Sequence, residues 1–100
     1  MDFIREDDSE NGVIKALDGE IQVGELTYTW SGSKRIIIDH TEVYQPYEGR
    51  GIGTGLVGAA MEFARENDIR ILPLCSFARK VIENDMNARA LLFVPGTTPP

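Results

Sequence analysis

Glycine recurs through the middle of this sequence, at positions 49, 51, 53, 55 and 58, where a strand-like pattern gives way to a helix-like one. The apolar residues that follow fall at helical spacing and predict an amphipathic helix over residues 52–66. Glycines let the backbone bend tightly and leave the N–H groups at the start of that helix uncovered. Such a helix start attracts anions, and Arg50 adds a cation suited to phosphate or pyrophosphate. The alternative is that the glycines serve only a tight turn and close helix packing.

Two well-known phosphate-binding motifs do not fit these glycines. Residues 53–58 match the GxGxxG string of dinucleotide-binding folds. That motif follows the first strand of a parallel sheet, however, and needs a later strand that ends in an acid. Here the next predicted strand ends at Leu74-Cys75. A P-loop is excluded because no Gly-Lys-Ser or Gly-Lys-Thr follows the glycines.

Apolar and β-branched residues predict strands on both sides of this segment. Strands over residues 13–17 and 20–30 flank Asp18-Gly19, which predicts a hairpin with a type I′ turn. A third strand over residues 35–43 contains three consecutive isoleucines, as expected where both faces are covered. After the helix, residues 69–74 predict a fourth strand, and Ser76 can cap a further helix. The pattern predicts an α+β or α/β domain, in which an antiparallel β-meander is followed by helix, strand and helix on a mixed sheet.

Length and charge limit what the chain can do. Its 100 residues make one domain, which is expected over residues 12–94. The acidic segment at 1–11 is interpreted as flexible, either a mobile terminus or an edge segment, and residues 95–100 are interpreted as a polar tail. The net charge of −6 argues against sequence-independent binding of nucleic acids. No apolar run approaches the roughly 20 residues of a membrane span, so no membrane partner is expected. A single cysteine, Cys75, and the lack of a signal segment favour a cytoplasmic location.

Three short motifs occur in order along the chain: His40-Thr41-Glu42-Val43, Glu48-Gly49-Arg50-Gly51-Ile52 and Pro73-Leu74-Cys75-Ser76-Phe77. Together with the meander and the central helix, they resemble the core of the GNAT superfamily of acyl-CoA N-acyltransferases. The likeness is closest to its small single-domain GNAT-like family of predicted acetyltransferases. The resemblance covers residues 12–92. It implies a minimal GNAT-like α+β fold that lacks the helices which larger relatives place between their first strands.

The resemblance also implies where a cosubstrate binds. The turn and the helix start would hold the pyrophosphate of coenzyme A, through Gly49, Arg50, Gly51, Ile52, Gly53 and Thr54. The pantetheine arm would pair with the strand around residues 42–44, and a backbone N–H near Val43 or Tyr44 would polarise the thioester carbonyl. Glu48 stands where the wider superfamily usually has Gln or Arg, and its charge predicts that it points away from phosphates. Acetyl-CoA or coenzyme A is the expected cosubstrate, and no metal site is predicted.

Cys75 lies between a predicted strand and a predicted helix, where helix amides and nearby Arg79 or Lys80 can stabilise a thiolate. The resemblance assigns Cys75 a place beside the bound cosubstrate. Two functional interpretations stay open. Either Cys75 accepts the acetyl group before passing it on, or it borders the acyl thioester while an amine attacks directly. The structural alternative is a small apolar filler of the core, the usual role of an unpaired cysteine.

His40 and Glu42 are the candidate bases, because direct attack needs a neutral amine and a group that takes its proton. By the period of two, both fall on the strand face of Ile36 and Ile38. The alternatives are a structural histidine bonded at a strand end and a solvated acid at a strand edge. With Cys75, these two side chains form the predicted catalytic set.

Three hypotheses about function follow. The leading one is an acetyl-CoA-dependent N-acetyltransferase acting on an unidentified amine, either a small molecule or a protein lysine. The second is a non-catalytic module that binds coenzyme A or acyl-CoA. The third is a structural interaction domain whose glycines serve only the fold. The acidic composition favours a cationic acceptor.

Overall fold

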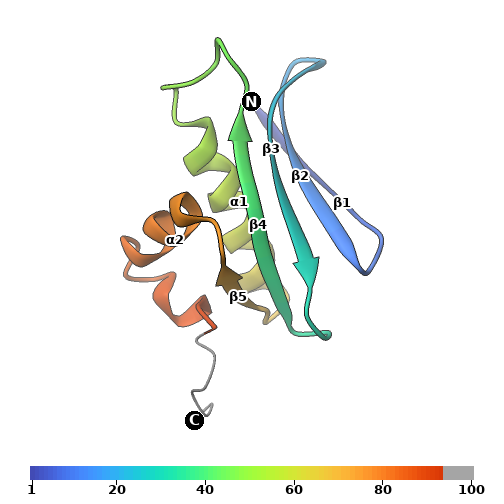
Figure 1. Cartoon of the computed structure of the whole chain (residues 1–100), viewed down its shortest axis with the longest axis vertical. Helices are drawn as coiled ribbons and strands as arrows, with labels where there is room; N and C mark the ends of the chain where they lie inside the picture. Colours follow the sequence, from blue (N-terminus) through green and yellow to red (C-terminus); the bar gives the residue numbers. More distant parts are fainter. Residues whose placement is uncertain (94–100) are drawn as a thin grey trace.

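One mixed β-sheet organises the molecule, and the computed structural model describes residues 1–93 of it. The predicted tail at 95–100 and the last residue of the predicted domain lie outside the described residues. The elements are β1 (Asp2–Asp7), β2 (Asn11–Asp18), β3 (Ile21–Trp30), β4 (Arg35–Val43), α1 (Ile52–Glu66), β5 (Arg70–Pro73), α2 (Ser76–Glu83) and the 3-10 helix η1 (Arg89–Leu91). The five strands lie in chain order, antiparallel except for the parallel β4–β5 pair (Figure 1). The predicted α+β fold on a mixed sheet is confirmed.

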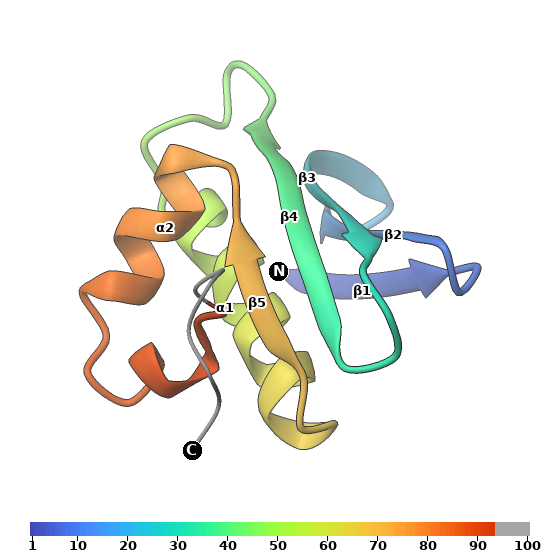
Figure 2. The same cartoon turned by 60° about the horizontal axis from the view of Figure 1, so that its bottom comes forward.

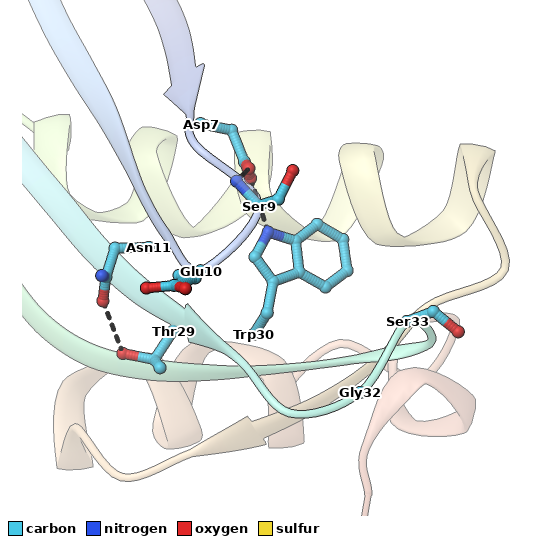
Figure 3. Close-up of a pocket in the computed structure, with 8 residues that line it drawn as sticks. All are labelled: Asp7, Ser9, Glu10, Asn11, Thr29, Trp30, Gly32 and Ser33. Carbon is cyan, nitrogen blue, oxygen red and sulfur yellow. Dashed lines mark hydrogen bonds between the residues drawn. The ribbon is translucent and has the colours of Figure 1, made fainter.

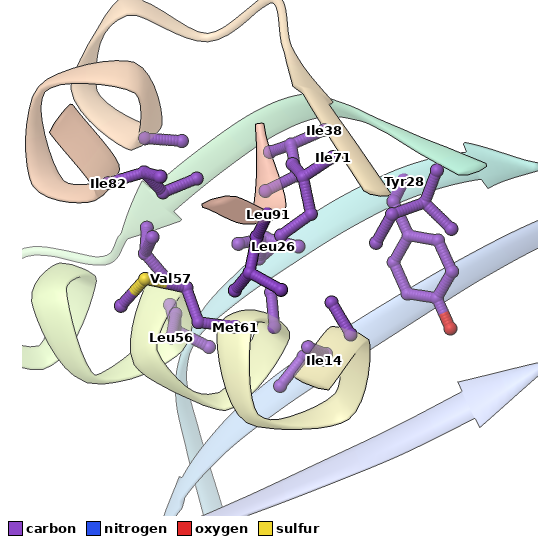
Figure 4. Packing of buried hydrophobic residues seen from close by; sticks show 14 of the residues in the cluster. Ile14, Leu26, Tyr28, Ile38, Leu56, Val57, Met61, Ile71, Ile82 and Leu91 are labelled. Carbon is purple, nitrogen blue, oxygen red and sulfur yellow. The ribbon is translucent and has the colours of Figure 1, made fainter. Parts of the chain in front are cut away.

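Helix α1 connects β4 to β5 and covers the core face of the sheet. Its buried side chains, Ile52, Leu56, Val57, Ala60, Met61 and Ala64, recur at helical spacing. They pack against Ile14, Leu26 and Ile38 of the sheet and against Ile82 of α2 (Figure 4). The predicted bounds of this helix and of β4 are both confirmed. No helix within residues 1–93 has the length and apolar character needed to cross a membrane.

The N-terminal residues form a strand, so the interpretation of residues 1–11 as a flexible segment was wrong for 2–7, and the edge alternative holds. β1 pairs with β2 along its whole length. Although β1 is acidic, its side chains alternate between the two faces of the sheet, and Phe3, Arg5 and Asp7 face the core side. The Arg5 guanidinium carbon lies 3.9 Å from the centroid of the Phe63 ring on α1. This stacking anchors the edge strand to the helix.

A polar network fixes the far end of β1. The Asp7 carboxylate accepts hydrogen bonds from the Tyr28 hydroxyl at 2.6 Å, the Trp30 indole N–H at 2.7 Å and the Ser9 backbone N–H at 2.6 Å. Burial by itself raises the pKa of Asp7, but these bonds and the Arg5 charge lower the pKa below its usual value. Burial and the bond to Asp7 raise the pKa of Tyr28 to about 12.

Two local expectations need correction. The hairpin between β2 and β3 is confirmed, but Asp18 pairs with Ile21, so Gly19 and Glu20 are the central turn residues. Of these two, only Gly19 has a positive φ, of 64°, which excludes the predicted type I′ turn because that turn needs positive φ at both positions. The isoleucine run in β4 does not mark full burial on both faces, since Ile36 and Ile38 are buried but Ile37 is half-buried.

Candidate functional site

A β-bulge near the middle of β4 decides which side chains face the helices. Thr27 pairs with His40 and Tyr28 pairs with Ile38, so Asp39 has no partner across the ladder. Beyond the bulge, Thr41 pairs with the buried Leu26, and its side chain therefore shares the core face. The predicted position of His40 and Glu42 beside Ile36 and Ile38 was wrong, because the period of two is reset by the extra residue.

The end of β4 also has an open edge. β5 pairs with β4 only as far as Ile38 and Pro73. The backbone N–H groups of Leu74 and Cys75 both reach the Ile38 carbonyl, at 3.1 and 3.3 Å, and the chain then turns away. Tyr44 donates its N–H to Val23 of β3 at 2.9 Å. Since backbone groups alternate along a strand, the N–H and C=O of Val43 point to the opposite, open edge.

The start of α1 carries free backbone donors. The first helical bond runs from the Gly55 N–H to the Gly51 carbonyl at 3.0 Å, so the N–H groups of Ile52, Gly53 and Thr54 have no acceptor within the helix. No side chain caps this helix, and its first turn holds no acidic residue. The positive end of the helix dipole is thus left without a neutralising group.

The turn before α1 needs its glycines for conformation. Gly49 and Gly51 have φ values of 82° and 79°, in the region that side-chain-bearing residues rarely adopt. Between them the exposed Arg50 places its guanidinium carbon 5.4 Å from the Tyr47 ring centroid. The turn therefore presents a cation beside uncovered amides, the arrangement that favours a phosphate group.

Gly53 is the point where three elements meet. A Cβ atom placed on it would lie 3.0 Å from the Phe77 ring of α2 and 3.6 Å from a methyl group of Val43. The start of α1, the open edge of β4 and the start of α2 are therefore neighbours, at the end of the sheet where β4 leaves it (Figure 2). The Phe77 side chain is 43% exposed at this junction.

Cys75 borders the same junction and is half-buried. Its sulfur lies 3.7 Å from the Thr41 hydroxyl. Burial by itself raises the pKa of the Cys75 thiol, but the nearby Ala78 N–H, Thr41 side chain and Phe77 N–H favour the thiolate and lower the pKa below its usual value. Cys75 is itself the N-cap residue and Ser76 the first residue of α2, so the predicted cap at Ser76 was wrong.

His40 and Glu42 lie on the sheet face opposite Thr41 and Cys75. Both side chains are exposed, at 61% and 53%, and the His40 Nε2 atom is 3.6 Å from the Glu42 Oε2 atom. The Tyr44 hydroxyl donates to Glu25 at 2.7 Å and accepts from Gln22 at 2.8 Å. The bond to Glu25 raises the pKa of the Tyr44 phenol.

The structure places Gly53 against Val43 and against Phe77, which follows Cys75 by two residues, and it sets the two predicted bases on the opposite face of the sheet. Two side chains at the junction, Thr41 and Phe77, were not assigned a role from the sequence. Both lie inside the motifs found there, but Thr41 could be placed beside Cys75 only once the bulge at Asp39 was known.

A separate hollow of about 650 Å³ lies between the β1–β2 and β3–β4 turns (Figure 3). Its lining includes Asp7, Asn11, Thr29 and Trp30, none of which belongs to the junction around Cys75. The Asp7 carboxylate is already taken up by the network that holds β1. Within residues 1–93, no three histidine, cysteine or acidic side chains are grouped so as to hold a metal ion.

Comparison with known protein families shows to which family the chain belongs. A family model described as GCN5-related N-acetyl-transferase matches residues 13–91, which include the bulged strand, the glycine turn and Cys75. The chain belongs to this family. GCN5-related membership indicates the acyltransferase class, and the resemblance found from the sequence motifs is confirmed.

Sequence relatives agree with this family. The chain is 32% identical over 75 residues to Protein NATD1 of Danio rerio, which covers 75% of this chain and 68% of that protein. It is 35% identical over 60 residues to Protein NATD1 of Xenopus tropicalis, covering 60% of this chain and 55% of that protein. The match thus spans little more than half the length of the second relative.

Solved structures share the fold. The solution structure of a GCN5-like protein from Staphylococcus aureus has a TM-score of 0.64 and 30% identity, covering 90% of this chain and 87% of that chain. The structure of AAC(6')-Iy in complex with the bisubstrate analogue CoA-S-monomethyl-acetylneamine has a TM-score of 0.57 and 13% identity, covering 93% and 68%. At that identity the second likeness is one of fold alone.

Proposed function

We propose that this protein is an acetyl-CoA-dependent N-acetyltransferase acting on an amine acceptor, either a small molecule or a protein lysine. The observation that carries the proposal is the uncapped start of α1 lying beside the open edge of β4 and Cys75. A two-part ligand with a pyrophosphate and an extended thioester arm suits that arrangement. The coenzyme A analogue bound to AAC(6')-Iy, which has the same fold, supports this choice of cosubstrate.

The cosubstrate would be held at both ends of this junction. The amides of Gly51, Ile52, Gly53 and Thr54, the bend at Gly49 and the Arg50 guanidinium would bind the pyrophosphate. The pantetheine amides would pair with the open backbone edge at Val43. Of the two expected donors to the thioester carbonyl, Val43 is the better candidate. The Tyr44 N–H already donates to Val23, and the Tyr44 carbonyl accepts from the Tyr47 N–H at 2.8 Å.

Cys75 could act in either of two ways. In the covalent route, its thiolate attacks the acetyl carbonyl carbon, a C–S bond forms at Cys75, and the C–S bond to coenzyme A breaks. Coenzyme A leaves as a thiolate and takes a proton from water; the amine then displaces the Cys75 thiolate and gives its own proton to the hydroxide that remains. In the direct route, the amine attacks the coenzyme A thioester while Cys75 lines the acyl site. The covalent route needs a reduced thiol, which suits a cytoplasmic setting.

His40 and Glu42 would serve the acceptor. They lie on the opposite face of β4 from Cys75, so an amine reaching the thioester from that face would meet them. Their pairing at 3.6 Å would let the Glu42 carboxylate hold a cationic amine while His40 takes the proton.

One observation favours a second candidate function, a non-catalytic module that binds acyl-CoA. The two proposed bases sit on the other face from the thiol, so the side that holds the thiol would bind the cosubstrate without supplying a base. Acetyl transfer from labelled acetyl-CoA to a panel of amines and lysine peptides separates the two functions. Product formed with multiple turnovers supports the enzyme, whereas tight binding without product supports the module.

Substitution of Arg50 tests the phosphate assignment. Arg50→Ala should weaken coenzyme A binding about tenfold, roughly 1.4 kcal/mol, while leaving a pantetheine thioester without the phosphates unaffected. The matched control is Arg65→Ala, which removes an exposed arginine at the other end of α1. Calorimetric titration measures both. Equal losses for coenzyme A and the pantetheine thioester would contradict the assignment, and no heat with millimolar coenzyme A would overturn the proposed function.

A further inference from the structure

The bulge at Asp39 has a chemical consequence for Thr41. Without the extra residue, Thr41 would fall on the face of Ile37, away from the helices. With it, Thr41 pairs with Leu26 on the core face and its hydroxyl oxygen comes within 3.7 Å of the Cys75 sulfur. That separation is within hydrogen-bonding range for sulfur. The bulge therefore brings the Thr41 hydroxyl close to Cys75, which lies 34 positions later in the chain.

The donors around Cys75 come from two elements. Thr41 contributes its side chain, which lies 3.7 Å from the sulfur, and its backbone N–H, and the start of α2 contributes the N–H groups of Phe77 and Ala78, all of which favour the thiolate and lower the pKa of Cys75. The amides of α2 are fixed by the helix that follows them. In the thiol form, the Cys75 S–H donates to the Thr41 hydroxyl oxygen. Once Cys75 is ionised, the Thr41 hydroxyl is the one side chain in this set that can donate to the sulfur, and it reaches Cys75 from the strand that forms the open edge.

The charged side chains near Cys75 do not serve as hydrogen-bond partners of its sulfur. On α2, the Arg79 guanidinium donates to the Pro73 carbonyl at 3.3 Å, and Lys80 is exposed. The first turn of α1 carries no acid. On β4, His40 and Glu42 lie on the opposite face, where they face each other. Among the described residues, the groups that favour the Cys75 thiolate are thus uncharged groups of Thr41 and α2.

We infer that Thr41 is a positioning residue of the acyl site, whose hydroxyl bonds the Cys75 sulfur and fixes it at the open edge of β4. The inference rests on the proposed function for the reaction that Cys75 serves, but the bond itself exists without any cosubstrate. A thiolate is a stronger acceptor than a thiol, so the hydroxyl favours the reactive form of Cys75. In either proposed route, the sulfur then faces the place where the thioester carbonyl would lie.

The test uses the full chain, whose only cysteine is Cys75. Alkylation by iodoacetamide is followed by mass spectrometry from pH 5 to pH 10 without acetyl-CoA. Thr41→Val removes the hydroxyl at nearly constant volume, Thr41→Ala is a second hydroxyl-free variant, and Thr41→Ser retains the hydroxyl. Thr27→Val is the matched control, because Thr27 lies on the neighbouring strand opposite His40, on the face away from Cys75. Circular dichroism checks that each variant is folded.

Loss of the hydroxyl should slow alkylation at pH 7 about three- to tenfold and move the pH profile upward, as expected for one ordinary hydrogen bond. Thr41→Ser should stay within about twofold of the wild type, and Thr27→Val should match it. The inference is overturned if folded Thr41→Val or Thr41→Ala gives the wild-type profile, or if Thr41→Ser loses as much as Thr41→Val.

Acetyl transfer is then measured on the same variants. Thr41→Val should lower kcat by a similar factor and leave the KM for acetyl-CoA within about twofold, because the phosphate contacts are untouched. A wild type that binds no coenzyme A refutes the proposed function but leaves the alkylation result standing. A wild type that transfers acetyl groups, with unchanged kcat in a folded Thr41→Val, overturns the role of Thr41 alone.

Discussion

At the residue scale, Gly53 and Gly58 occupy the same helix in different surroundings. A Cβ atom on Gly53 would press against the Phe77 ring at 3.0 Å, whereas one on Gly58 would meet nothing within 4 Å. Neither residue needs a positive φ. Replacing each glycine by alanine therefore separates two effects: the general loss of stability that any glycine causes in a helix, and the need for an open space beside Phe77 at Gly53.

Gly58→Ala should raise the free energy of unfolding by about 0.8–1 kcal/mol and leave coenzyme A affinity unchanged. Gly53→Ala should gain less stability, because the Phe77 ring has to shift, and it should weaken coenzyme A binding by disturbing the junction with Val43. Urea denaturation and calorimetric titration measure the two effects. Equal behaviour of the two variants in both measurements would contradict this account of Gly53.

Asp39 shows at the same scale what the sequence could not reveal. The bounds of β4 were predicted correctly, but nothing in residues 35–43 marks which one lacks a partner. That single unpaired residue turns Thr41 toward Cys75 and His40 away from it. The unpaired residue is set by the register of β4 against β3 across their hairpin, so the pattern within β4 alone cannot report it.

At the scale of elements, β1 depends on the Asp7 network. The Asp7 carboxylate accepts hydrogen bonds from Tyr28 and Trp30 of β3, and Arg5, which is also on β1, contacts Phe63 of α1. An acidic run of this kind is typical of a disordered terminus, which explains the wrong prediction. The partners that stabilise the strand lie more than 20 residues away.

Asp7→Ala should lower the free energy of unfolding by about 1–3 kcal/mol at pH 7, because the Tyr28 and Trp30 donors lose their acceptor. The pKa of Asp7 is lowered in the folded state, so its ionised form contributes stability above the unfolded value of 3.8. That contribution is lost as the pH falls through the lower folded value. Urea denaturation at pH 7 and near pH 3 should show a smaller difference between wild type and variant in acid. A loss equal to that of the exposed control Asp2→Ala would contradict the network's role.

The central helix and its turn were the most predictable elements. The apolar spacing after Gly51 predicted α1 with its observed bounds, since a helix pattern is local. The glycines around its start predicted uncovered amides there, and the structure shows no side-chain cap at that end. The neighbours of those amides, Val43 and Phe77, come from separate elements and required the fold.

At the scale of the whole molecule, a single sheet splits at one end, and this split forms the proposed site. β4 and β5 stay paired from Arg35 to Ile38 and part beyond it, and α1 and α2 both begin beside the opening. The motifs predicted the membership in the GCN5-related family, which the family model confirms. The sheet face on which His40 and Glu42 lie was not predictable, because the bulge at Asp39 resets the alternation of β4.

The most direct measurement is the change in backbone amide NMR signals of the full chain as coenzyme A is added. The account predicts saturable shifts for the amides of Gly51, Ile52, Gly53 and Thr54 and for that of Val43. Signals from Asn11 and Trp30, which line the hollow near β1, should stay in place. Shifts confined to that hollow, or no shifts at millimolar coenzyme A, would contradict the claim that the start of α1 and the open edge of β4 form the cosubstrate site.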